Sequence, residues 1–247
     1  MSTIVLGDSW VDDLFSTTTW VKHVFPDSTS FGKLLSCVSD INTQRKVIQA
    51  EKYIIHVGGN DFLTRLPNCV LDHFKDCIRL YLGLPSLYYA SMAKQVFEEY
   101  RKMTAEMALD SQVVICSIPI GPAIPFSMRI MRLSAPFQCK KVTESIRQII
   151  DTEFRKQFIT LPDVILFDIY EVVQKNKIKY HFDGLHPTDE GYKVIANNYK
   201  EQSFVIKTET LPTFTKLEAC IGTFFSIVLG VVIVPIVYTY KKVKHFL

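Results

Sequence analysis

The chain has 247 residues, of which 48% are hydrophobic and 12% aromatic, so it is long enough to bury a full core in one domain. Its formal net charge is +3, and no dense stripe of lysine and arginine is interleaved with aromatic residues, so we expect no nucleic-acid partner. Six cysteines lie without paired spacing and without a cysteine–histidine metal pattern, so we expect reduced thiols and no metal site.

Short apolar runs alternate with longer amphipathic stretches along most of the chain. The runs are continuously apolar, which is typical of strands that are buried on both faces of a sheet. The predicted strands are Ile4–Leu6, a weaker Val21–Phe25, Tyr53–Val57, Val113–Ile118 and Val164–Phe167.

The stretches between these runs have helical spacing. The predicted helices are Leu34–Val47, Met92–Leu109, Val142–Phe158 and Gly191–Tyr199. Strands and helices that alternate in this way predict an α/β fold, with a mostly parallel sheet sandwiched between helices.

The C-terminal segment differs from the rest of the chain, because no charged residue occurs from Ala219 to Tyr240. A helix of that length would extend about 33 Å, enough to cross the hydrocarbon core of a bilayer. Tyr238 and Tyr240 lie where an interfacial belt is expected, and lysines follow directly at positions 241, 242 and 244. We therefore expect a membrane anchor, with a buried helix or strand of the soluble core as the alternative.

The predicted organisation is an α/β domain over residues 1–201, a polar linker over 202–216, a transmembrane helix over 217–240 and a basic tail over 241–247. The first residues lack the basic and apolar regions of a secretory signal, so we expect none. Insertion after synthesis would leave the domain in the cytosol and carry the basic tail across the membrane, against the usual positive-inside bias.

Three short motifs carry residues suited to catalysis. Gly7-Asp8-Ser9 follows the first predicted strand, Gly58-Gly59-Asn60-Asp61 follows the third, and Asp183-Gly184-Leu185-His186 follows the last. Because parallel sheets bind ligands at the carboxyl ends of their strands, we expect the motifs to face one crevice. Each motif alone could be an ordinary turn or a loop that leads into a helix; the three together, in this order, indicate a site.

A serine hydroxyl becomes an effective nucleophile when a base takes its proton. The spacing of Asp183 and His186 lets the carboxylate accept from one imidazole nitrogen while the other nitrogen faces Ser9. The side-chain amide of Asn60 and the backbone N–H of Ser9 could stabilise an oxyanion, and the N–H of Gly32 is the best candidate for a third donor. His56, inside the third strand, is expected to be a satisfied core histidine rather than a ligand.

The three motifs resemble the conserved blocks of the SGNH (GDSL-type) hydrolase family, in the family's order and over about residues 3 to 200. The resemblance implies a flavodoxin-like three-layer α/β/α sandwich around a five-stranded parallel sheet, with no metal or organic cofactor. The site residues that it implies are Ser9 as nucleophile, His186 as base, Asp183 as the group that orients it, and Asn60 with Gly32 as the oxyanion hole.

Two features depart from the family's pattern. Trp10 stands where leucine usually follows the serine, which bears on the shape of the acyl pocket rather than on the chemistry. The glycine block around Gly32 is degenerate, so its identification depends mainly on its place after a predicted strand. The G-x-S-x-G elbow of the α/β-hydrolases is absent around Ser9, which excludes that family.

We therefore expect a membrane-tethered serine esterase that cleaves a carboxylic ester or thioester through an acyl-enzyme. The substrate would be a lipid, an acyl-protein or an acetylated sugar, and the membrane would be the other partner. An acyltransferase that uses the same site and a non-catalytic membrane-bound scaffold are the alternatives. The sequence gives no basis for an oligomeric state.

Overall fold

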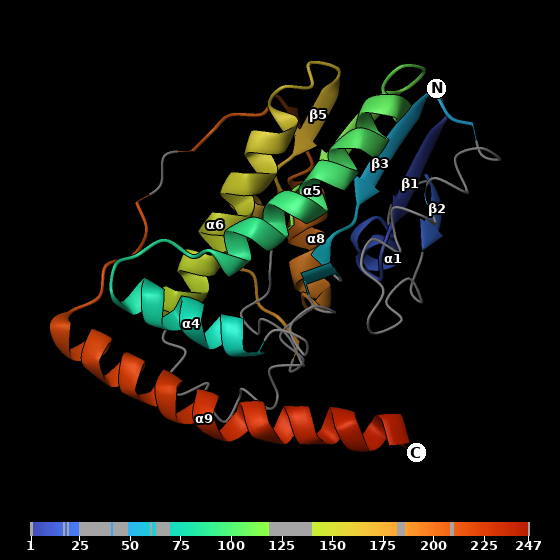
Figure 1. Ribbon diagram of the computed structural model, residues 1–247. Helices are drawn as coiled ribbons and strands as arrows, with labels where there is room; N and C mark the ends of the chain where they lie inside the picture. The colour runs from blue at the N-terminus through green and yellow to red at the C-terminus, as the bar shows by residue number, and fades with distance from the viewer. Residues whose placement is uncertain are drawn as a thin grey trace.

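The computed structural model of the chain defines an α/β domain with a long C-terminal helix (Figure 1). Its description covers residues 2–16, 18, 20–24, 41, 49–59, 61–62, 70–118, 140–181, 186–207 and 210–246.

The sheet has six strands in the order β2-β1-β3-β4-β5-β6. Their bounds are β1 Thr3–Gly7, β2 Val21–Val24, β3 Lys52–His56, β4 Gln112–Cys116, β5 Val164–Phe167 and β6 Glu201–Gln202. The first five are parallel, which confirms the predicted five-stranded parallel sheet, and their order is that of flavodoxin-like folds. The sixth is antiparallel to β5 and was not predicted, because two residues are too few to show a pattern.

Helices of the described residues lie on both faces of this sheet (Figure 1). Three of the predicted helices are confirmed, with ends shifted by a few residues, while the predicted Leu34–Val47 lies almost entirely outside the described residues. The observed helices are α1 Trp10–Leu14, α4 Val70–Tyr81, α5 Tyr88–Met107, α6 Lys140–Phe158, α7 Ile169–Asn176, α8 Asp189–Asn197 and α9 Lys216–Phe246.

Strands β1, β3, β4 and β5 each contribute apolar side chains to two separate cores, as the period of two residues requires. On β1, Ile4 and Leu6 belong to the core under α5 and α6, whereas Val5 belongs to the core under α1 and α8. The same alternation on β3 places Ile55 in the first core and Ile54 in the second. This confirms the three-layer sandwich and explains why the strands are continuously apolar.

Helix α4 was not predicted, because two of its buried positions are polar. The buried carboxylate of Asp76 accepts hydrogen bonds of 3.1 Å from the backbone N–H groups of Leu87, Tyr88 and Tyr89, and another from the Ser86 hydroxyl. It thereby satisfies amides at the start of α5 that have no partner within the helix. Asp76 forms this cap, and its polar side chain interrupts the apolar stripe by which the sequence would otherwise indicate α4.

The second polar residue is His73, which is buried between the Tyr89 hydroxyl and the Cys77 thiol. Burial lowers the pKa of His73 to about 4 from its ordinary value of 6.5, because the charged ring would lose its hydration. The histidine is therefore neutral in the folded protein at physiological pH.

Helix α9 is long and apolar enough to cross a membrane over Lys216–Ile236. Only 22% of that stretch is buried in the protein, which does not fit the helix of a soluble core. The helix begins with a reciprocal cap, in which the Thr215 hydroxyl accepts from the Glu218 N–H and the Glu218 carboxylate accepts from the Thr215 N–H. It continues to Phe246 and so includes most of the expected basic tail.

The segment before α9, expected to be a polar linker, contacts the domain at several points. Phe204 is buried and packs on the rings of Phe154 and Phe158 of α6. The Lys207 ammonium lies 3.1 Å from the carboxylate of Asp168, the residue that caps α7. Phe214 packs edge-on against Tyr81 of α4. These contacts tie the start of α9 to the domain.

We predict that His73 makes stability depend on pH between about 6.5 and 4. The unfolded chain takes up the proton near 6.5 and the folded protein only near 4, so stability is complete above 6.5 and falls as the pH drops through this window, by up to about 3 kcal/mol. Urea unfolding across this pH range should show a shallower decline for His73→Gln than for the natural chain. The matched control is His181→Gln, at an exposed position; parallel curves for all three proteins would contradict the prediction.

Candidate functional site

Ser9 lies at the carboxyl end of β1, directly before the first turn of α1. Gly7 lies close to β3, and only glycine fits there. A Cβ on Gly7 would lie 2.5 Å from the carbonyl oxygen of His56 and 2.2 Å from the Val11 side chain. The turn leaves the Ser9 side chain exposed at the edge of the sheet where ligands of parallel α/β folds bind.

The hydroxyl of Ser9 lies 2.9 Å from Nε2 of His186, although 177 positions separate the two residues in the chain. This is a hydrogen-bonding distance. If Nδ1 of the ring carries the proton, Nε2 accepts from the hydroxyl and can take its proton when the oxygen attacks an electrophile. The pair therefore has the geometry of a nucleophile beside its general base.

A short antiparallel backbone contact and the start of α8 hold His186 in place. The His181 N–H donates to the His186 carbonyl at 2.8 Å, and Tyr180 pairs with Pro187. Thr188 then caps α8, its hydroxyl accepting from the Gly191 N–H at 3.2 Å. The backbone at Tyr180 and His181 thus holds His186 from one side, and the start of α8 holds it from the other.

Helices α1 and α8 pack against each other, so the segments that carry Ser9 and His186 are also in contact through these helices. The ring of Trp10 meets the ring of Tyr192 edge-on, with centroids 5.7 Å apart. Trp10 follows Ser9 directly and Tyr192 stands one turn into α8, so this aromatic contact joins the turn that carries Ser9 to the helix that follows His186.

Asp8 and His56 form a buried pair beneath the serine. One carboxylate oxygen of Asp8 accepts from the Trp10 N–H at 3.1 Å and lies 3.1 Å from Nδ1 of His56, whose ring also stacks on Trp10 with centroids 5.1 Å apart. With Nδ1–H donating to Asp8, Nε2 of His56 has no hydrogen-bond partner among the described residues. His56 is thus a buried core histidine, as expected, with one ring nitrogen paired to a carboxylate that the sequence did not indicate.

The Gly58-Gly59 segment lies beside the same turn. Gly58 has φ +114°, which disfavours any residue with a Cβ, and a Cβ on Gly59 would lie 3.8 Å from Asp8 Oδ2. Asp61, two residues later, is buried and accepts a hydrogen bond from the hydroxyl of Tyr100 on α5. The second motif is therefore adjacent to the first, and Tyr100 is an anchor that sequence reasoning missed because it lies within an apolar stripe.

Of the five residues predicted for the site, the structure brings Ser9 and His186 together. Asp183, Asn60 and Gly32 lie outside the described residues, so their positions stay predictions. Among the described residues, no group of three or more histidine, cysteine or acidic side chains is clustered closely enough to hold a metal.

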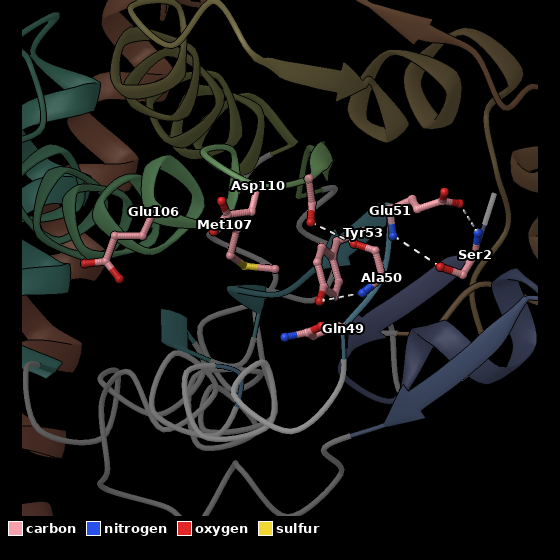
Figure 2. Close-up of a pocket in the computed structure, with 9 residues that line it drawn as sticks. Ser2, Gln49, Ala50, Glu51, Tyr53, Glu106, Met107 and Asp110 are labelled. Atoms are coloured by element: carbon pink, nitrogen blue, oxygen red, sulfur yellow. Dashed lines mark hydrogen bonds between the residues drawn. The ribbon is translucent and has the colours of Figure 1, made fainter.

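A cavity of about 500 Å³ lies at the opposite edge of the sheet, at the amino ends of β1, β3 and β4 (Figure 2). Several polar groups in its wall bind one another: the Ser2 N–H donates to the Glu51 carboxylate at 2.7 Å, and the Ala50 N–H donates to the Tyr53 hydroxyl at 3.0 Å. The serine–histidine pair does not line this cavity, because it lies at the carboxyl ends of the strands.

Comparison with known proteins gives one family match and several similar structures. The family model described as GDSL-like Lipase/Acylhydrolase matches residues 23–199, more than half of the chain; His186 lies inside this match and Ser9 before it. No curated protein sequence matches the chain.

Three solved structures illustrate the structural similarity. A lipolytic protein of the G-D-S-L family from Veillonella parvula is 14% identical, with a TM-score of 0.46, over 80% of this chain and 94% of that one. A psychrotrophic esterase from Pseudoalteromonas sp., inhibited by monoethylphosphonate, is 12% identical, with a TM-score of 0.45, over 79% and 92%. A family 3 carbohydrate esterase from Clostridium thermocellum is 14% identical, with a TM-score of 0.41, over 80% and 92%.

The buried pair beneath the serine can be tested by His56→Phe. This change keeps a ring that can stack on Trp10 but removes the donor to Asp8, so we expect the free energy of unfolding at pH 7 to fall by about 1–3 kcal/mol in urea titrations. His181→Phe, at an exposed position, is the matched control and should change it by less than about 0.5 kcal/mol. Equal stability of His56→Phe and the natural chain would show that the Asp8 contact contributes nothing.

Proposed function

Because the chain belongs to the GDSL-like lipase/acylhydrolase family, we propose that it is a serine ester hydrolase attached to a membrane through α9. The observation that carries this proposal is the 2.9 Å contact between the Ser9 hydroxyl and Nε2 of His186 at the carboxyl edge of the sheet. A scaffold that had lost catalysis would have no need to keep a nucleophile and a base at this distance.

In the proposed reaction, His186 takes the proton of Ser9 as the serine oxygen attacks the carbonyl carbon of an ester or thioester. The tetrahedral intermediate collapses, the alcohol or thiol leaves with the proton from His186, and the acyl group stays on Ser9. Water, activated by the same histidine, then releases the carboxylic acid. We assign Asp183 the role of orienting the imidazole, and Asn60 with Gly32 the role of stabilising the oxyanion.

The proposed substrate is the ester or thioester of a lipid or another amphiphilic acyl donor, with acyl-proteins and acetylated sugars as further members of this class. Membrane attachment supports this choice, because an enzyme held at a bilayer meets substrates that partition into it. We place the hydrolase domain on the cytosolic side of that membrane. No metal or organic cofactor enters the proposed reaction.

We predict that a fluorophosphonate probe labels the folded protein at Ser9. Such probes form a covalent bond only with an activated serine, so Ser9→Ala should abolish labelling and His186→Gln should slow it at least about a hundredfold, measured by intact-protein mass spectrometry over time. The matched controls are Ser16→Ala, at an exposed serine just after α1, and His181→Gln. Labelling that survives in Ser9→Ala, or its absence from the folded natural protein, would contradict the assignment.

We also predict hydrolysis of p-nitrophenyl acyl esters, with kcat lowered by about 10⁴ or more in Ser9→Ala. A series from acetate to palmitate would show which acyl chain the site accepts. Product analysis with a competing alcohol distinguishes the two fates of the acyl-enzyme, since a hydrolase yields mainly free acid and an acyltransferase mainly the new ester. Predominance of the new ester would replace hydrolase by acyltransferase.

A further inference from the structure

Helix α9 has two faces, and the domain covers one of them. Gly222, Ser226, Gly230 and Ile233 are buried and recur at the spacing of one helical face. Gly222 lies against the ring of Tyr81 of α4, so closely that a Cβ would fall 2.2 Å from a ring atom. Small residues therefore allow α9 to dock closely along α4.

A second contact along the same face confirms that the docking extends over several turns. A Cβ on Gly230 would lie 3.6 Å from the ring of Phe74, which is ordinary contact, and both Phe74 and Tyr81 are buried. At the start of the helix, the Lys141 ammonium of α6 lies 2.9 Å from the Glu218 carboxylate. The docked face thus runs from the first turn of α9 to Ile233.

The opposite face of α9, which we call the outer face, is exposed and apolar. Phe224 is 61% exposed and Val231 is 69% exposed, and both lie on the side of the helix away from Gly222 and Gly230. The other members of the outer face are Leu217, Ile221, Ile227, Val228, Val232, Ile236 and Tyr238. A contiguous apolar surface of this extent marks a site of interaction.

The docked position of α9 is incompatible with a helix that crosses a bilayer. If α9 crossed while docked, α4 would enter the hydrocarbon with the exposed side chains of Asp72 and Lys75. If it crossed after undocking, the aromatic side chains of Phe74 and Tyr81 would be exposed to water. A helix that stays docked and lies in the plane of the membrane surface meets neither difficulty.

We propose that α9 stays docked on α4 and lies in the membrane interface, with its outer face in contact with a lipid leaflet. Three lysines, at positions 241, 242 and 244, follow the uncharged stretch and complement the headgroups of an anionic bilayer. The inference deepens the membrane attachment within the proposed function and rests on it, but it does not depend on ester hydrolysis.

This arrangement also determines which way the sheet edge that carries Ser9 and His186 faces. In Figure 1 the strands point toward the side of the domain along which α9 runs, so the carboxyl ends of β1 and β3 face that side. Ser9 and His186 lie at this edge. An in-plane α9 therefore turns the serine–histidine pair toward the leaflet, from which an acylated amphiphile can reach it.

The position of the C-terminus tests the proposal. The full chain, with an epitope after Leu247, is synthesised in the presence of sealed vesicles of phosphatidylcholine and phosphatidylglycerol, floated, and treated with protease from outside. We expect the chain to float and the epitope to be digested as fast in sealed vesicles as in detergent-opened ones. An epitope protected in sealed vesicles, or a chain that does not float, overturns the proposal.

Docking in the membrane-bound state is tested by photo-crosslinking. With p-benzoylphenylalanine in place of Tyr81 or, separately, Phe74, illumination of floated vesicles should join α4 to α9, as identified by peptide mass spectrometry. The same group at the exposed Leu109, after α5, is the control and should give no crosslink to α9. Floated protein that shows no crosslink from either position would mean that α9 had undocked, and overturns the proposal.

The outer face is tested by Val231→Glu, which should lower the vesicle-bound fraction about tenfold or more. Leu109→Glu, at an exposed apolar residue outside α9, is the matched control and should leave binding unchanged. Unchanged binding of Val231→Glu would exclude lipid contact through this face. None of these measurements uses enzymatic activity, so failure of the hydrolase assignment would be seen separately, as loss of probe labelling.

Discussion

The close pairing of β1 and β3 at their carboxyl ends is the constraint on which the site depends. Gly7 pairs with His56, and no Cβ could fit between them. The Asp8 N–H then donates to the His56 carbonyl at 3.1 Å, which continues the pairing by one residue beyond β1 and turns the chain into α1. Ser9 follows this short turn and is exposed at the edge of the sheet.

Strands β1 and β3 also flank the point where the order of the strands in the sheet reverses. The chain passes from β1 outward to β2 and then returns to β3 on the other side of β1, and ligands of parallel α/β folds bind at the carboxyl ends of strands at such a point. The buried Asp8–His56 pair lies beneath Ser9 at this edge, and the contact between Trp10 and Tyr192 joins it to α8. Packing within the second core therefore links the turn that carries Ser9 to the helix that follows His186.

The C-terminal helix α9, the candidate membrane helix, starts from a defined place on this domain. Phe204 and Phe214 pack on aromatic rings of the domain and Lys207 pairs with Asp168, so the start of α9 is held against the domain. Its small residues face α4 and its large apolar residues face outward. In the proposed membrane-bound state, this connection would orient the sheet edge that carries Ser9 and His186, which a flexible tether would not do.

The sequence by itself determined the elements whose signal is local. Continuous apolar runs indicated the five parallel strands, because strands that are buried on both faces are apolar at successive positions. The uncharged stretch from Ala219 indicated the candidate membrane helix, because a helix in contact with lipid carries few charged residues. Three motifs in order indicated the hydrolase family. Helices α1, α4 and α7 were missed, since they are short or carry buried polar residues such as His73 and Asp76.

The motifs predicted that His186 would face Ser9, but only the tertiary structure brings the two within 2.9 Å of each other across 177 positions of the chain. It alone also identifies the carboxylate of Asp8 as the partner of His56. An apolar stretch does not reveal that one of its faces packs on α4. These contacts depend on strand order and helix packing, which are set by the whole core rather than by any single segment.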